Sequence, residues 1–124
     1  KVGYPCPAFG IGEAFTKANP IILAIQNKTG NTPDSYALAV YDAIMITALS
    51  IMGSDSKDMS KEFFRQAIIK QAELYYGATG WTILDENGDR KYASFDMLGI
   101  RSQAGKSSWQ SIGTYSETIG YRPN

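Results

Sequence analysis

The chain has 124 residues, a length that suits one small domain, and its 44% hydrophobic and 19% charged residues are typical of a globular protein. Its 12 Lys and Arg residues balance its 12 Asp and Glu residues, which argues against a nucleic-acid-binding or anionic-membrane-binding surface. Histidine is absent, which excludes catalytic triads with a histidine base and most zinc sites, so we expect no enzyme activity, no metal and no cofactor.

The N-terminal part of the chain is predicted to contain a strand, a loop and a helix. Residues 2–4 form the expected strand, which the prolines after it interrupt, and residues 8–14 form the loop. Asn19 suits the N-cap of a helix and Pro20 suits its first position. Gly30 follows a cation in the last turn and is expected to end this helix.

The single cysteine, Cys6, has no partner within the chain and therefore cannot form an internal disulfide. Two interpretations stay open: a buried thiol, or a disulfide to a cysteine outside these residues.

A second helix is predicted from Ser35 to Met52, after Asp34 or Thr32 as N-cap and before Gly53. This segment is apolar on almost every side, and such a helix lies in the middle of an assembly. A chain of this length can barely cover it, so we expect the chain to be the central part of something larger. The interior Asp42 does not suit a membrane span.

The remainder is predicted to hold a third helix and a β-meander. The helix begins at Ser56 or Asp58, runs through Tyr76 with an amphipathic pattern, and is ended by Gly77. The strands cover 81–84, 91–101 and 107–115, with a hairpin turn at 87–88 and a loose tail from 120 to 124. Trp81 and Trp109 could stack on a ligand, but each lies in an alternating segment, so they are interpreted as packing on the sheet. The acidic turn at 85–90 lacks the spacing of a calcium loop.

These elements predict an α/β fold with three helices packed on a small mixed sheet and a C-terminal β-meander. The order of several short motifs then resembles the C-terminal third of type I periplasmic solute-binding proteins. The motifs are Tyr41-Asp42-Ala43, Gly77-Ala78-Thr79-Gly80, residues 85–90 and the segment 109–115. The closest branch binds branched-chain amino acids, amides and urea for ABC importers.

The resemblance implies that residues 1–124 are a single fragment of a two-lobed fold. They would close one lobe and supply the last strands that cross to the other lobe. The implied partners are a small polar solute, an ABC permease and the missing remainder of the same chain, at a location outside the cytoplasmic membrane. It also implies that this chain alone binds solute weakly or not at all.

Four residues are candidates for contact with the solute. Tyr36 falls where family members present an aromatic residue, and it offers a flat apolar face and a hydroxyl. Tyr41 and Asp42 lie further along the same helix, and Tyr4 lies where the chain would leave the other lobe. The structural alternatives are core packing for Tyr36, a hydrogen bond from Asp42 to a neighbouring loop, and a hinge strand for Tyr4.

Two other functions stay open at the sequence level. The same fold serves as the extracellular ligand-sensing domain of a receptor or kinase. The second alternative function is a stand-alone interaction module. In such a module, the apolar surface of the helix at 35–52 would form a homodimer interface.

Overall fold

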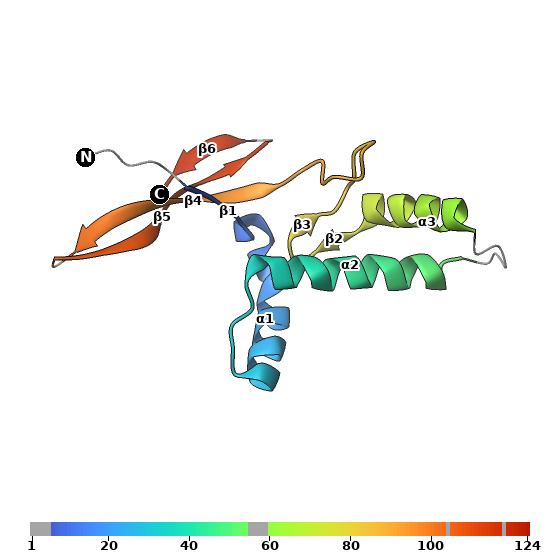
Figure 1. Ribbon diagram of the computed structural model, residues 1–124, viewed down its shortest axis with the longest axis horizontal. Helices are drawn as coiled ribbons and strands as arrows, with labels where there is room; N and C mark the ends of the chain where they lie inside the picture. Colours follow the sequence, from blue (N-terminus) through green and yellow to red (C-terminus); the bar gives the residue numbers. More distant parts are fainter. Residues whose placement is uncertain (1–5, 55–59, 104, 118) are drawn as a thin grey trace.

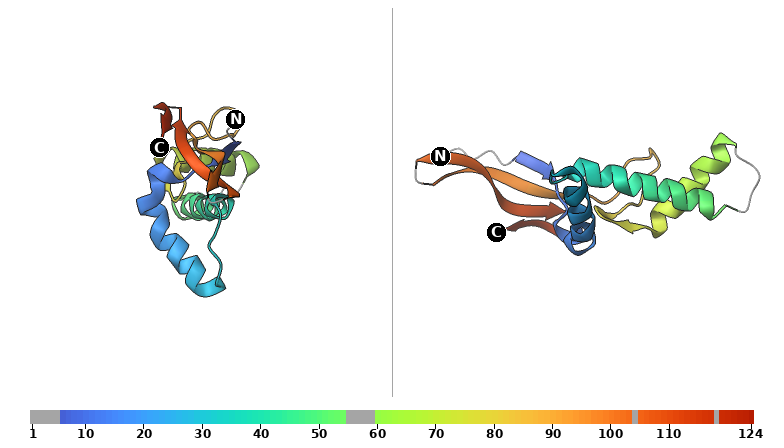
Figure 2. Two further views of the ribbon diagram at one scale, coloured as in Figure 1. Left: turned by 90° about the vertical axis from the view of Figure 1, so that its left-hand side faces the viewer. Right: turned by 90° about the horizontal axis from the view of Figure 1, so that it is seen from below.

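The computed structural model describes residues 6–54, 60–103, 105–117 and 119–124. A four-stranded sheet extends from one end of the molecule and two long helices extend from the other (Figure 1). The view from below shows the same elongated arrangement, with the sheet at one end of the long axis and helices α2 and α3 at the other (Figure 2). The α/β class is therefore confirmed, but the helices do not lie over the face of the sheet as predicted.

The sheet has the order β1-β4-β5-β6, and its strands are β1 (Cys6–Phe9), β4 (Ser94–Gln103), β5 (Lys106–Ser116) and β6 (Gly120–Pro123). Every pairing in it is antiparallel, so the expectation of a mixed sheet was wrong. Pro7 lies inside β1, which is an edge strand and so tolerates a residue without an N–H. The strand predicted at residues 2–4 lies outside the described residues.

The tail that the sequence predicts to be loose is strand β6 instead. Gly120 has a φ of 77°, a left-handed conformation that glycine adopts without strain, and the chain folds back along β5 there. Side chains then fix the tail: the hydroxyl of Tyr121 donates to the carbonyl of Ile112, and the amide of Asn124 donates to the hydroxyl of Ser111 at 2.9 Å. The polar composition of residues 120–124 alone does not indicate these hydrogen bonds to β5.

The first helix starts earlier than predicted. The short 3₁₀ helix η1 (Gly12–Ala14) continues into α1 (Phe15–Thr29), so Pro20 lies inside the helix and not at its first position. A proline inside a helix removes one backbone hydrogen bond. The turns on both sides of Pro20 are nevertheless helical. The C-terminus agrees with the prediction, because Gly30 is left-handed, with a φ of 74°, and caps the helix.

Helix α2 (Ser35–Met52) has the predicted bounds. Asp34 is the N-cap, and its carboxylate accepts the backbone N–H of Ala37 at 2.8 Å. One face, with residues four apart, is buried, and its members are Leu38, Asp42, Ile46 and Ser50. The opposite face exposes large apolar side chains, namely Tyr36, Val40, Ile44, Ile51 and Met52. We call this second set the open face of α2.

Among the described residues, α2 is the one helix whose length and composition would allow it to cross a membrane. Its mean hydropathy is 1.5. Core helices of soluble proteins and signal sequences meet the same criterion, so α2 alone does not show where in the cell the protein lies.

Helix α3 (Lys61–Leu74) begins at the N-cap Ser60, whose hydroxyl accepts the N–H of Phe63. The predicted starts fall within 55–59, outside the described residues. The helix ends before Tyr76, because β2 (Tyr76–Gly77) and β3 (Gly80–Trp81) form a small hairpin. Helices α2 and α3 pack together.

The interior of the chain is small for its mass. The buried apolar side chains among the described residues are Ala14, Ala18, Leu38, Ile46, Ala72 and Ala78, four of them alanines. The accessible surface is 8923 Å². A compact monomer of 13.6 kDa exposes about 6,600 Å². The chain thus exposes about a third more surface than a compact domain of this size.

Candidate functional site

The chain passes twice between the sheet and the helical part, and both passages lie at the same place. It leaves β1 through Gly10 and returns to β4 at Ser94, and the N–H of Gly10 donates to the carbonyl of Ser94 at 2.9 Å. Gly10 is buried, and a Cβ there would lie 2.8 Å from the backbone nitrogen of Asp96. Two paired segments therefore connect the two parts of the molecule.

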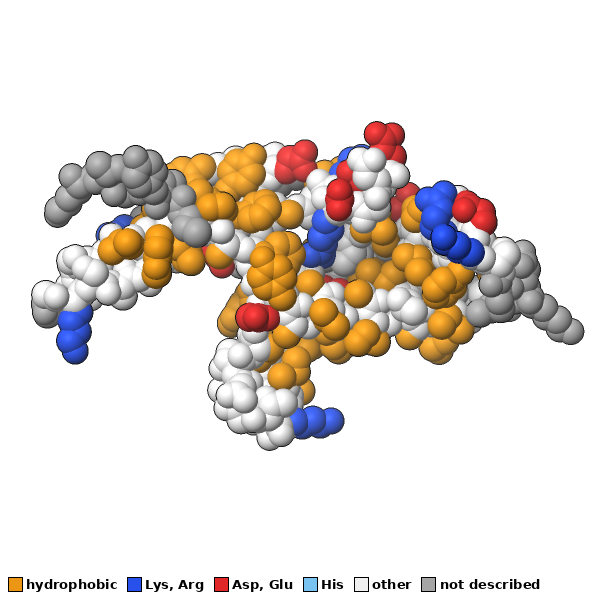
Figure 3. Space-filling model, viewed as in Figure 1, with side chains coloured by type: hydrophobic (Ala, Val, Ile, Leu, Met, Phe, Trp, Pro, Cys, Tyr) orange, Lys and Arg blue, Asp and Glu red, His pale blue; other side chains and the backbone are white. Residues whose placement is uncertain are grey.

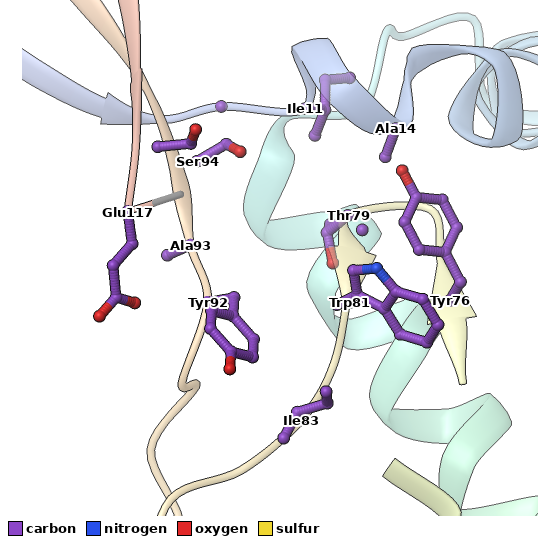
Figure 4. Close-up of a pocket in the computed structure, with 13 residues that line it drawn as sticks. Ile11, Ala14, Tyr76, Thr79, Trp81, Ile83, Tyr92, Ala93, Ser94 and Glu117 are labelled. Atoms are coloured by element: carbon purple, nitrogen blue, oxygen red, sulfur yellow. The ribbon is translucent and has the colours of Figure 1, made fainter. Parts of the chain in front are cut away.

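A hollow lies directly beside this double crossing, and we call it the hinge hollow. Its volume is about 280 Å³. Tyr76 and Trp81 of the β2–β3 hairpin stand on one side, with ring centroids 5.3 Å apart in an edge-to-face arrangement. Tyr92 and Glu117, from the other side of the crossing, stand opposite (Figure 4). The hollow thus takes its walls from both parts of the molecule.

The lining of the hinge hollow suits a small solute with one apolar and one polar end. Aromatic rings supply flat contact surface, and Trp81 is 49% exposed toward solvent. Glu117 is exposed and supplies a carboxylate, while Ser94 and Ser116 add hydroxyl groups. This combination of mostly apolar walls with few polar groups is typical of sites that bind small molecules.

Asp42 anchors the loop between β2 and β3. Its side chain is 2% exposed. One carboxylate oxygen accepts the N–H of Ala78 at 2.7 Å, and the other accepts both the N–H of Thr79 at 2.9 Å and its hydroxyl. Three donors therefore compensate for the burial of this group. The hydrogen bond from Asp42 to a neighbouring loop, the structural alternative that the sequence left open, is present.

Burial and the charge of Asp42 shift the pKa values of two nearby side chains, Tyr75 and Arg90. Burial, with smaller contributions from Asp42 and Tyr41, raises the pKa of the Tyr75 phenol. Burial lowers the pKa of the Arg90 guanidinium, and the negative charge of Asp42 partly offsets this effect. Arg90 also lies over the ring of Phe9, with its Cζ atom 5.5 Å from the ring centroid.

The three predicted contact residues that the structure describes do not come together in one hollow. Tyr36 is 72% exposed at the start of α2 and stacks on Phe9, with ring centroids 6.3 Å apart. Tyr41 is half-buried against the small apolar cluster of Ala18, Leu38 and Ala78. Asp42 is engaged by the β2–β3 loop, and Tyr4 lies outside the described residues. None of the three that the structure describes lines the hinge hollow.

Of the residues that line the hinge hollow, the sequence drew attention to Trp81 alone, as a side chain that could stack on a ligand. Trp81 was interpreted as sheet packing, yet it faces the hollow from a two-residue strand. Tyr92 precedes β4, and Glu117 follows β5. The usable sequence signal was the pair of aromatic residues on either side of the glycine-bounded segment 77–80.

In the part of the chain that the structure describes, no group of three or more His, Cys, Asp or Glu side chains is placed to hold a metal ion. The described salt bridge between Arg65 and Glu62, 3.2 Å long, lies on the exposed side of α3.

Comparisons with known proteins give one distant relative. No family model matches the chain, and no solved structure matches it. The uncharacterized protein MJ1266 of Methanocaldococcus jannaschii is 26% identical over 98 residues, which cover 71% of this chain and 22% of the relative. The match therefore spans about a fifth of the length of that protein.

Proposed function

We propose that this chain is part of the solute-binding component of an ABC importer and that it holds a small polar solute without covalent chemistry. The observation that carries the proposal is the hinge hollow, which is lined from both parts of the molecule beside a double crossing of the chain. The expected solutes are branched-chain amino acids, amides, urea and similar molecules. The permease and a place outside the cytoplasmic membrane belong to the same proposal.

The mechanism follows from the position of the hollow. A solute that touches Trp81 on one side and Glu117 on the other contacts both parts of the chain at once. Such a solute favours the arrangement in which the two parts are closest, because only that arrangement makes all of the contacts. Closure about the Gly10–Ser94 crossing would then report occupancy to a permease.

Two further observations support the part of the proposal in which the chain belongs to a larger parent protein. The chain exposes about 2,300 Å² more surface than a compact monomer of its mass, which is the scale of a permanent interface. Its relative MJ1266 extends well beyond the matched segment. In this proposal, the remainder of the same polypeptide covers the open face of α2.

Calorimetry on the protein as it is encoded in its natural gene tests the proposal, with leucine, isobutyramide and urea as probes. At least one probe should bind, and Trp81→Ala should weaken its binding by about 1–3 kcal/mol, the usual effect of truncating a buried aromatic anchor. Trp109→Ala is the matched control, because Trp109 is 56% exposed on β5, away from the hollow. Equal effects of the two substitutions, or no binding of any probe, would contradict the proposal.

The open face of α2 favours a second candidate, an interaction module that pairs with another copy of itself. Its large apolar side chains, among them Val40 and Ile44, are at least half exposed. In that case the chain forms a dimer and binds none of the solutes. Light scattering combined with the same calorimetry separates the two functions.

A further inference from the structure

Three aromatic side chains bound the hinge hollow on two sides. Tyr76 and Trp81 form one corner, where the planes of their rings meet at 83° with the centroids 5.3 Å apart. The ring of Tyr92 stands across the hollow from them (Figure 4). The three side chains are 36%, 49% and 37% exposed, in the order named, so each keeps open surface that a ligand can contact.

The charge in the lining of the hinge hollow has one sign. Among the described residues that line the hollow, Glu117 is the charged one, and neither lysine nor arginine is present. The side chain of Glu117 is exposed, and no described residue forms an ion pair with it. A negative charge and the faces of aromatic rings both attract cations. The lining therefore favours a positively charged ligand and offers no basic side chain to a carboxylate.

One cation of the chain already lies beside these rings. The Nζ atom of Lys91 is 5.7 Å from the centroid of the Tyr92 ring. Lys91 does not line the hollow, so its ammonium group approaches Tyr92 from outside. Because the side chain of Lys91 is exposed, water and salt screen its repulsion of a cation in the hollow.

The mostly apolar lining selects among cations. A primary ammonium carries three N–H donors, and each needs an acceptor once water is removed. A quaternary ammonium has no N–H donor and surrounds its charge with methyl groups, which suit aromatic walls and the apolar side chains of Ile11 and Ile83. A cavity of about 150 Å³ already holds benzene. The hinge hollow, at about 280 Å³, therefore has room for an ion of the size of choline.

We propose that the hinge hollow binds a small organic ammonium ion, and that a quaternary ammonium such as choline fits it best. The three rings surround the methyl groups of the ion, and the negative charge of Glu117 adds to the attraction. This inference rests on the proposed function, because it names the class of solute that the same hollow holds. It disfavours solutes with a carboxylate, for which the lining has no basic partner.

An exposed apolar surface by itself would not select a cation. Hydrophobic side chains gather over α2 in the space-filling view (Figure 3). Such a surface binds an uncharged ligand at least as well as a cation of the same shape, because burial of apolar area is the driving force. The test therefore compares choline with neohexyl alcohol, in which a carbon atom replaces the quaternary nitrogen and the shape is kept.

Calorimetry on the protein as it is encoded in its natural gene measures the binding of both ligands and of leucine. Choline should bind at least about tenfold more tightly than neohexyl alcohol, because only choline carries a charge, and also more tightly than leucine. Glu117→Gln should lower the preference for choline over neohexyl alcohol by about threefold. Glu86→Gln is the matched control, since Glu86 is exposed in the turn at 85–90, and it should leave the preference unchanged.

Two substitutions of Trp81 separate an aromatic contact from an apolar one. Trp81→Phe keeps an aromatic face, whereas Trp81→Leu keeps only an apolar side chain. Choline should bind Trp81→Leu at least about fivefold more weakly than Trp81→Phe, while neohexyl alcohol should bind the two variants alike. Trp109→Leu is the matched control, because Trp109 is 56% exposed on β5, away from the hollow, and it should bind choline as the wild type does.

The outcomes distinguish this inference from the proposed function. Binding of leucine, isobutyramide or urea without a preference for choline would overturn the inference and leave the proposed function in place. Equal affinities of choline and neohexyl alcohol, or equal binding of choline to the two Trp81 variants, would overturn the inference as well. If none of these solutes binds, choline included, both fail. A preference for choline that depends on Trp81 and Glu117 would support the inference whichever of the other solutes binds.

Discussion

The carboxylate of Asp42 occupies the space that a side chain at Gly77 would need. A Cβ built on Gly77 would meet three atoms of that carboxylate at distances that real Cβ atoms essentially never show. The close approach lets Asp42 reach the backbone N–H groups of Ala78 and Thr79, which follow directly after the glycine. A residue in the middle of α2 thus fixes the hairpin that carries Trp81 into the hinge hollow.

Gly77→Ala should destabilise the fold by about 1–3 kcal/mol, because the added methyl group must displace a buried carboxylate. Urea denaturation measures this free energy of unfolding. Gly12→Ala is the control, since a Cβ at Gly12 meets nothing within 4 Å, and it should change stability by no more than about 0.5 kcal/mol. Similar losses in the two variants would show that the contact with Asp42 is not the cause.

Asp42→Ala should lower the free energy of unfolding by about 2–5 kcal/mol, because it leaves the buried N–H groups of Ala78 and Thr79 without acceptors. Thr79→Val removes only the hydroxyl donor and should lower it by about 1 kcal/mol. Urea denaturation of both variants gives the comparison. If Asp42→Ala were as stable as Thr79→Val, the carboxylate would not hold the loop.

Tyr36→Ala should leave both solute binding and stability nearly unchanged, because the side chain is 72% exposed, stacks on Phe9 and does not line the hinge hollow. Calorimetry with the solute that binds, together with urea denaturation, tests both halves. Ile100→Ala, which truncates a 61% exposed side chain on β4, serves as the control. A clear loss of affinity in Tyr36→Ala, but not in Ile100→Ala, would instead show that the solute contacts Tyr36 outside the hinge hollow.

The elements that were predicted well are those with local causes. Asp34, Gly30 and Gly53 mark helix ends because a cap needs only a suitable side chain or backbone conformation within a few residues. Strand β6 was missed because its partner in β5 lies outside that range. Pro20 was misplaced because η1, which starts the helix earlier, has no strong sequence pattern.

Less of the candidate site than of the fold could be predicted from the sequence. Trp81, Tyr92 and Glu117 come from three separate segments that only the folded chain brings together. The partners of Asp42 are 36 and 37 residues away from it. The sequence showed that Asp42 needed a partner, but the identity of that partner follows from the packing of α2 against the β2–β3 hairpin.

Tyr75 should give the fold a pH dependence in alkaline solution. Its pKa is raised in the folded state, so the folded chain keeps the phenol proton at a pH where the unfolded chain loses it. This difference in the pKa of Tyr75 contributes stability that is fully present below a pH of about 10. The contribution is lost as the pH rises through the pKa of the folded state. Tyr75→Phe should therefore be less sensitive to this rise in urea denaturation. It should also remove a late step from the ultraviolet titration of the phenolates, whereas an identical titration would contradict the burial effect.

The open face of α2 should make the isolated 124-residue chain self-associate, because water-exposed apolar side chains along one helix are stabilised by mutual burial. Ile44 lies near the middle of this face and is 62% exposed. Ile44→Glu should shift the chain toward the monomer in sedimentation velocity without changing its circular dichroism spectrum. Leu23→Glu is the matched control, since Leu23 is 49% exposed on α1, outside the open face, and it should not alter association. A wild-type chain that stays monomeric at high concentration would show that α2 needs no cover, which would remove the main support for a larger parent assembly.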